Sequence, residues 1–200
     1  MTKKYPWDIH SDLTEERLVK VAGLIRRGRE DALDRHNEDI GDDNWLLGCS
    51  AYRFGCFRID QAAETEAYPW LVVLNPSLEF VFQIGAYPVR FFRDDADEPS
   101  MRGRARAHAE LDQMHLALPT SEDTALTCRF VVNTDGAGSV LAIKFVAFEG
   151  EMPVMVWDVP LGAEPVYLPI AAEAPSEGVD LPAPAVRLPS EEKERKGGAA

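Results

Sequence analysis

The feature that most constrains the fold of this chain is a series of short apolar runs separated by turn residues. The runs are of strand length and rich in Val, Phe and Ile, which favour β-strands, and signals such as Asn75-Pro76-Ser77 and Gly85-Ala86 divide them. The six runs are Leu71–Leu74, Glu79–Ile84, Pro88–Arg93, Leu126–Thr134, Ser139–Phe148 and Val154–Trp157. They predict an antiparallel sheet of about six strands, arranged as two meanders, the first of which has one buried face.

Helical patterns surround these runs. Apolar residues recur at helical spacing within Ser11–His36, where Ser11 or Thr14 can cap the first turn. A second helix is expected over Asn44–Ala63, although its aromatic content and two glycines argue against one. The residues at intervals of three and four that favour it are Trp45, Cys49, Tyr52, Cys56 and Ile59. Met101–Leu116 predicts a third helix. Two or three helices packed on an antiparallel sheet make an α+β fold.

The C-terminal part has a different composition. Seven of the 14 prolines lie between Pro160 and Pro189, and proline lacks the amide hydrogen that helices and sheets use. We therefore expect a single α+β domain over residues 1–172 and a Pro-rich, disordered tail over residues 173–200.

Several features predict a cytoplasmic protein. No apolar run approaches the roughly 20 residues that span a bilayer, and the N-terminus lacks the apolar segment of a signal peptide. Three cysteines without a CxxC pair fit neither a disulfide framework nor a zinc site, so Cys49, Cys56 and Cys128 are interpreted as reduced, buried residues. Fifteen arginines against six lysines suggest a bacterial or phage origin.

The chain is strongly acidic, with a net charge of −13. From Ala171 onward there are six acids and four bases, a net of −2, so the remaining −11 belongs to the folded part. Such a surface repels phosphates and anionic lipid, which argues against binding to duplex DNA or to membranes. It favours a basic protein partner, although solubility alone also accounts for it.

One group of residues has the chemistry of a metal site. His108, Asp112 and His115 would share one face of a helix, and imidazole and carboxylate groups bind zinc, iron or manganese. A further ligand would have to come from Asp94, Asp95 or Asp97. The spacing matches no established motif such as HExxH, so exposed polar residues on a surface helix are the alternative interpretation.

An arginine cluster is a second candidate site, for an anion. Arginine forks suit phosphate or carboxylate groups, of a phosphate ester, an acidic peptide or RNA. Asp94, Asp95, Asp97 and Glu98 lie within the same stretch, so internal ion pairing is the alternative. The cluster comprises Arg90, Arg93, Arg102, Arg104 and Arg106.

Two possible nucleophiles are interpreted as structural. Ser50 follows Gly48-Cys49 as in a nucleophile elbow, but Tyr52 stands where that turn needs glycine. Cys128 lies within a predicted strand, where burial would make the thiol inert.

No strong catalytic constellation, P-loop or dinucleotide fingerprint is present, and no motif identifies a family. We therefore expect a non-catalytic, acidic protein-binding or regulatory accessory protein without a cofactor. It would bind a basic partner through a sheet face, a sheet edge or its acidic surface. The alternative is an enzyme, either a metal-dependent hydrolase using His108, Asp112 and His115 or a phosphate-ester enzyme using the arginine cluster.

Overall fold

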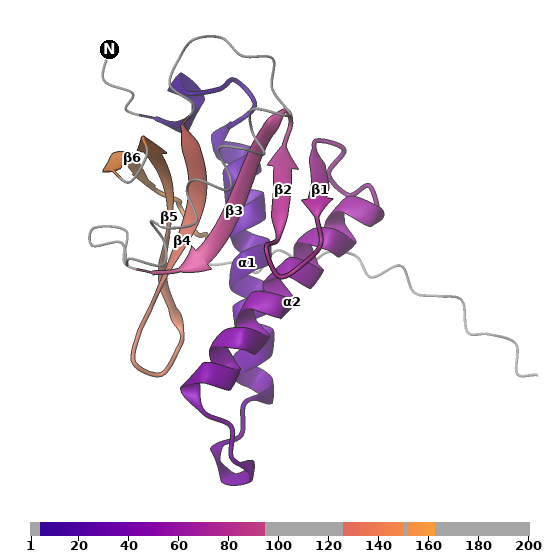
Figure 1. Cartoon of the computed structure of the whole chain (residues 1–200), viewed down its shortest axis with the longest axis vertical. Coiled ribbons are helices and arrows are strands. Elements are labelled where there is room, and N and C mark those ends of the chain that lie inside the picture. Colours follow the sequence, from indigo (N-terminus) through magenta and orange to yellow (C-terminus); the bar gives the residue numbers. More distant parts are fainter. Residues whose placement is uncertain (1–4, 95–125, 150–151, 163–200) are drawn as a thin grey trace, which may run out of the picture. The chain divides into compact units, whose positions relative to one another are not determined.

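The computed structural model describes residues 5–94, 126–149 and 152–162 (Figure 1). Two α-helices, α1 (Glu15–Arg35) and α2 (Asn44–Glu64), precede the strands, and a short 3-10 helix precedes each of them: η1 (Pro6–Asp8) and η2 (Glu38–Ile40). The strands are β1 (Leu71–Asn75), β2 (Val81–Ile84), β3 (Tyr87–Arg93), β4 (Thr127–Thr134), β5 (Val140–Glu149) and β6 (Met152–Asp158). The predicted helix Met101–Leu116 and the predicted tail from residue 173 lie outside the described residues.

The six strands form one sheet in the order β1-β2-β3-β4-β5-β6. Four of the five neighbouring pairs are antiparallel, as predicted, but β3 and β4 run parallel, with Val89 opposite Cys128 and Arg93 opposite Val132. The sheet is therefore mostly antiparallel, with one parallel pair at its centre. Parallel neighbours need a crossover of a dozen residues or more, and residues 94–126 provide that length.

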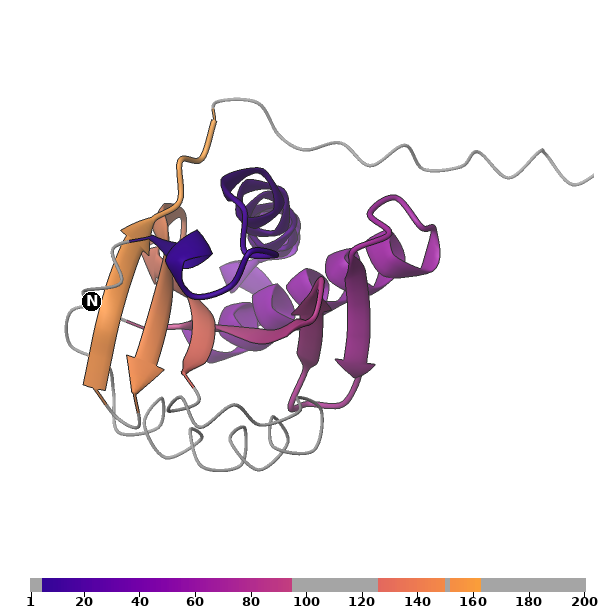
Figure 2. The same ribbon diagram turned by 90° about the horizontal axis from the view of Figure 1, so that it is seen from above.

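Both α-helices lie on the same face of the sheet (Figure 2). Thr14 caps α1 by accepting a hydrogen bond from the Arg17 backbone N–H, and Asp43 caps α2 in the same way through the Leu46 N–H. The main core lies between the helices and the sheet. Its largest fully buried side chains include Leu18 and Leu24 of α1, Ile59 of α2, and Phe82 and Phe130 of the sheet.

Glycine sets the distance between the two helices. A Cβ on Gly28 would lie 2.4 Å from the backbone nitrogen of Gly55, and a Cβ on Gly55 would lie 2.9 Å from the Phe91 ring. The helices therefore cross with their backbones nearly touching, and Gly55 leaves room for the Phe91 ring of β3. Both glycines weaken a helix by themselves, but here the packing requires them.

The face of the sheet turned away from the helices also contains buried side chains. Val131, Val146 and Phe148 form a small cluster, against which Phe92 packs. The Arg129 guanidinium lies over the rings of Phe92 and Phe148, at 5.4 and 5.6 Å. The sheet therefore has buried residues on both faces, whereas the alternation in the first meander predicted one buried face there.

The helically spaced residues of α2 do not all face the core. Tyr52, Cys56 and Ile59 face inward, but Trp45 and Cys49, in the first half of the helix, are exposed. Leu47, Ala51 and Gly55 take the inward positions there, and the first two of them pack against Ala32 at the end of α1. None of the helices among the described residues has the length and apolar character needed to cross a membrane.

Candidate functional site

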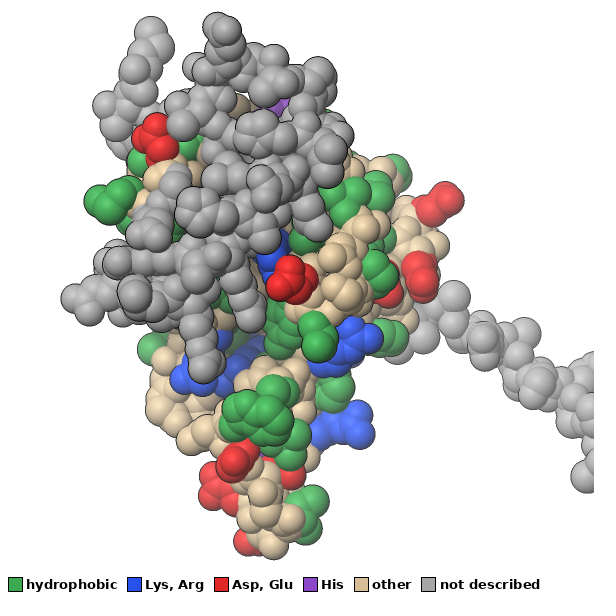
Figure 3. Space-filling model, in the orientation of Figure 1, with side chains coloured by type: hydrophobic (Ala, Val, Ile, Leu, Met, Phe, Trp, Pro, Cys, Tyr) green, Lys and Arg blue, Asp and Glu red, His purple; other side chains and the backbone are tan. Residues whose placement is uncertain are grey.

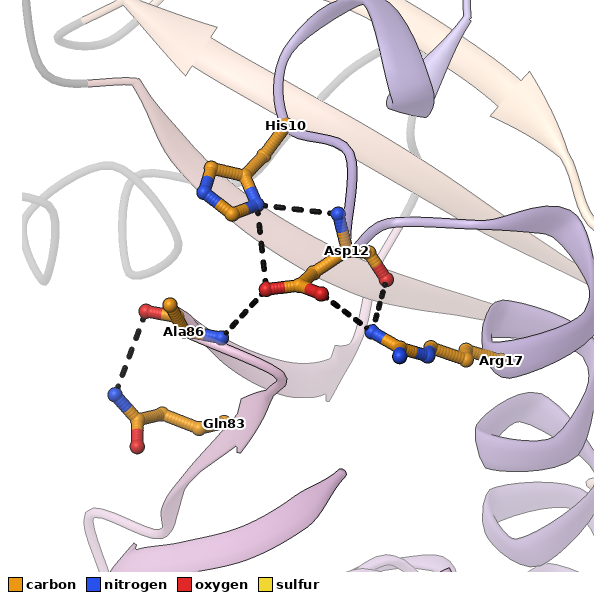
Figure 4. A network of polar contacts seen from close by, with 5 residues as sticks. All are labelled: His10, Asp12, Arg17, Gln83 and Ala86. Atoms are coloured by element: carbon orange, nitrogen blue, oxygen red, sulfur yellow. Dashed lines mark hydrogen bonds and ion pairs between the residues drawn. The ribbon is translucent and has the colours of Figure 1, made fainter. Parts of the chain in front are cut away.

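A polar network joins the N-terminal segment to the turn between β2 and β3 (Figure 4). One carboxylate oxygen of Asp12 accepts a hydrogen bond from the Ala86 backbone N–H at 2.9 Å, and the other accepts one from Arg17 at 2.7 Å. His10 Nδ1 accepts a hydrogen bond from the Asp12 backbone N–H at 3.2 Å. Both oxygens of the carboxylate are thus engaged within the protein.

These contacts stabilise the charged form of Asp12. The hydrogen bond from Ala86 has the largest effect on the pKa of Asp12, followed by the hydrogen bond from Arg17, and together they lower it below the ordinary value of 3.8. Gly85 brings the turn close enough, since its φ is +63° and a Cβ there would lie 2.2 Å from the Asp12 carboxyl carbon. We interpret this network as a structural clamp, because its groups satisfy one another.

A second group of carboxylates lies at the other end of α1, in the loop between the two helices. We call residues 36–46 the hairpin tip. The Asp42 carboxylate accepts a hydrogen bond from the Asn37 backbone N–H at 2.9 Å, and the Asn37 side chain accepts one from the Asp39 N–H at 3.0 Å. Gly41, with a φ of +100°, ends η2. These short-range contacts fix the loop without burying it.

Large apolar side chains are exposed at the hairpin tip. Ile40 is 77% exposed and Trp45 is 74% exposed, and Leu46 beside them is 41% exposed. Figure 3 shows hydrophobic and acidic side chains together at the lower end of the view, where Figure 1 places this loop. A Trp in water is uncommon, and exposed apolar groups bordered by polar ones are typical of protein-binding surfaces.

The hairpin tip is also negatively charged. Residues 37–44 contain four acids and no base. The carboxylates of Asp42 and Asp43 both accept hydrogen bonds within the loop. Asp42 accepts one from the Asn37 backbone N–H, and Asp43 caps α2. Glu38 and Asp39 are exposed, and no cation among the described residues forms an ion pair with either. Their charge is therefore presented to solvent.

The sequence-predicted metal and anion sites fall only partly within the described residues. His108, Asp112 and His115 lie outside them, as do Arg102, Arg104 and Arg106. Arg90 is buried on the face of β3 turned away from the helices, whereas Arg93 ends the same strand on the helix side. Within the described ranges, no three His, Cys, Asp or Glu side chains are grouped closely enough to hold a metal ion.

The structure also places the candidate nucleophiles. Cys128 is buried in the core as predicted, whereas Cys49, expected to be buried, is exposed because α2 turns its other side inward. Ser50 lies inside α2, not on a strand-to-helix turn. Cys56 is buried beside Tyr52, and desolvation raises its pKa to about 11, which keeps the thiol protonated.

The acids of the loop are visible in the sequence, but the exposure of its apolar residues is not. The spacing of Trp45, Cys49, Tyr52 and Cys56 indicates a helix without showing which side of it faces the core. A second series at helical spacing, Leu47 and Ala51, occupies the buried side there and was the signal that could have shown Trp45 to be exposed. Compared with protein-family models, curated proteins and solved structures, the chain matches none of them.

Proposed function

We propose that the protein is a non-catalytic binding or regulatory module, which uses the hairpin tip to bind a protein with a basic surface. The observation that supports this most is the exposure of Trp45 and Ile40 among carboxylates. Trp is enriched among residues that dominate binding energy, and it contributes most when its ring enters an apolar recess of the partner. The recess would be bordered by Lys or Arg.

The negative charge of the hairpin tip is the reason to expect a partner with a basic surface. Glu38 and Asp39 attract a cationic surface at long range, while Ile40 and Trp45 supply apolar area on contact. Such an interaction forms faster at low salt, because ions screen charges beyond about 8 Å at physiological ionic strength. The net charge of −13 favours the same class of partner and opposes binding to duplex DNA.

We further propose that the protein acts in the cytoplasm of a bacterium or of a phage-infected cell. Its three cysteines are free thiols, which suits a reducing compartment. No cofactor is required by this function, because binding needs no reactive group.

The test compares proteins captured by the wild type with those captured by variants of the hairpin tip. The bait is the full chain, and the lysate comes from cells that encode it. Capture that disappears in the double variant Trp45→Ala/Ile40→Ala supports the proposal. The matched control is Val72→Ala/Leu74→Ala, which removes two exposed apolar side chains from β1 and should retain the partner.

Association kinetics of a captured partner give the second part of the test. Glu38→Lys/Asp39→Lys should slow association about tenfold or more and change dissociation little, as expected for electrostatic steering. These positions are preferable to Asp42 and Asp43, whose carboxylates hold the loop. A partner that both sets of tip variants bind as well as the wild type does, or turnover of a substrate without any partner, would overturn the proposal.

A further inference from the structure

Arg29 of α1 is buried but makes few hydrogen bonds. Its side chain is 5% exposed, and its Nε–H donates to the Gly138 carbonyl in the β4–β5 turn at 2.6 Å. Among the described residues this carbonyl is the only acceptor of the guanidinium, which has five N–H donors. The other N–H donors of the guanidinium are not among the buried unpartnered atoms of the described residues, so they remain open to a further acceptor.

A second cation lies near it. Burial lowers the pKa of Arg29 most, and the positive charge of Arg93 lowers it further. Asp135 acts in the opposite direction and less strongly, and its carboxylate already accepts a hydrogen bond from the Ser139 N–H at 2.8 Å. The Arg29 guanidinium therefore lies within the field of a second cation, and the one carboxylate that acts on it is engaged in its own turn.

The sheet adds an unused hydroxyl to this region. Arg93 ends β3 opposite Val132 of β4, and Thr134 is two residues further along β4, so both project toward the helix side. The Thr134 Oγ1 is buried, and among the described residues it has no hydrogen-bond partner. A buried hydroxyl without a partner is rare, because it loses its water without replacement.

We propose that Arg29, Arg93 and Thr134 form a binding site for a small oxyanion, a phosphate or carboxylate group, between α1 and the ends of β3 and β4. An oxyanion provides several acceptor oxygens for the unused N–H donors and for the hydroxyl. Its negative charge also offsets the repulsion between the two arginines. Guanidinium groups bind such oxygens in pairs, which gives the site its chemical class. This site is separate from the hairpin tip and does not depend on the proposed function.

The competing interpretation is that Arg29 only fastens the turn to α1. Gly138 fits either one, since its φ is +93° and a Cβ there would lie 2.9 Å from Arg29 Nη2. The two interpretations differ in what Arg93 does. A fastening role of Arg29 needs no second arginine, whereas an oxyanion site does.

The test follows the arginine Nε–H resonances of the full-length protein by NMR at neutral pH. Sodium phosphate, sodium acetate and sodium chloride are titrated separately at equal ionic strength. We expect saturable shifts at Arg29 and Arg93 with phosphate or with acetate, and none with chloride. Tighter binding of phosphate would indicate a phosphoryl ligand, and tighter binding of acetate a carboxylate ligand. Shifts no larger than those in chloride would overturn the proposal.

Variants separate binding from folding. Arg93→Gln removes an exposed side chain and should weaken oxyanion binding at least tenfold without changing the thermal midpoint appreciably. Thr134→Val keeps the shape and should weaken binding several-fold. The matched control is Lys20→Gln, which removes a cation from α1 about 13 Å along the helix axis from Arg29. Equal affinity in Arg93→Gln and in the control would contradict the site.

Discussion

The clamp around Asp12 and the hairpin tip lie at opposite ends of α1, and both contain carboxylates. At the clamp, Asp12 accepts hydrogen bonds from Arg17 and from the Ala86 backbone, so its charge is used inside the protein. At the tip, Glu38 and Asp39 have no such partner among the described residues, and the large side chains of Ile40 and Trp45 face solvent.

The difference separates residues that hold the fold from residues available to a partner. A satisfied carboxylate contributes to stability, and its removal leaves the Ala86 N–H and Arg17 without an acceptor. An exposed carboxylate contributes little to stability, because solvent screens it. Exposed apolar side chains also contribute little to stability, because they stay in water and gain no free energy of burial when the chain folds.

Two glycines with positive φ give the largest expected contrast. Gly85→Ala should lower the free energy of unfolding by about 2–4 kcal/mol, since it strains the turn and displaces Asp12. Gly41→Ala meets no atom within 4 Å, so it should cost only the strain of about 1–2 kcal/mol. Urea unfolding of both variants measures the difference. Equal losses of unfolding free energy in the two variants would show that displacing Asp12 adds no cost at Gly85.

Asp12→Asn should produce the next largest effect, a loss of about 1–2 kcal/mol at neutral pH, because a charged acceptor becomes neutral. The pKa of Asp12 is lowered in the folded protein, so its contribution is full above the ordinary value of 3.8. It is lost as the pH falls below that value through the lowered pKa. Wild type and Asp12→Asn should therefore converge in stability in acid, which urea unfolding over a pH series will show.

The control for this pH series is Asp39→Asn at the tip, where the carboxylate accepts no hydrogen bond among the described residues. Its stability should stay within about 0.5 kcal/mol of the wild type, as for most surface substitutions. A dependence on pH like that of Asp12→Asn would mean that the tip is also part of the clamp.

Apolar truncation at the tip should have the smallest effect on stability. Trp45→Ala and Ile40→Ala should each change the free energy of unfolding by no more than about 0.5 kcal/mol, since both side chains are exposed. Ile59→Ala, on the buried side of the same helix, should cost about 2–5 kcal/mol. A large loss on truncating Trp45 would place that ring in the core and remove it from the proposed surface.

Local patterns in the sequence were enough to predict most elements of the described fold. Leu18, Val21 and Ile25 recur at helical spacing after the cap Thr14, and the structure places them in α1. The parallel pairing of β3 with β4 was not predictable, because residues 94–126 separate the two strands and no local signal records their direction. The role of Gly28 was hidden for the same reason, since its partner Gly55 lies in another helix.

The site was predictable only in its charge. Acids in the loop are visible in the sequence, but exposure of Trp45 depends on which side of α2 faces α1, and that is decided by close packing at Gly28 and Gly55. The arginine pair was hidden in a similar way. Arg93 was grouped with Arg90 by proximity in sequence, whereas the strand separates them and the fold brings Arg93 near Arg29.

Site-specific photo-crosslinking in the cells of origin shows whether the hairpin tip binds a partner, because it reports contact at a single position. A photoreactive residue replaces Ile40 at the hairpin tip, or Leu78 in the β1–β2 turn, which is equally exposed at 80%. We expect a discrete crosslinked protein from position 40, lost when Glu38 and Asp39 are both changed to Lys, and none from position 78. Crosslinks of the same protein from both positions, or from position 78 alone, would contradict the hairpin tip as the binding surface.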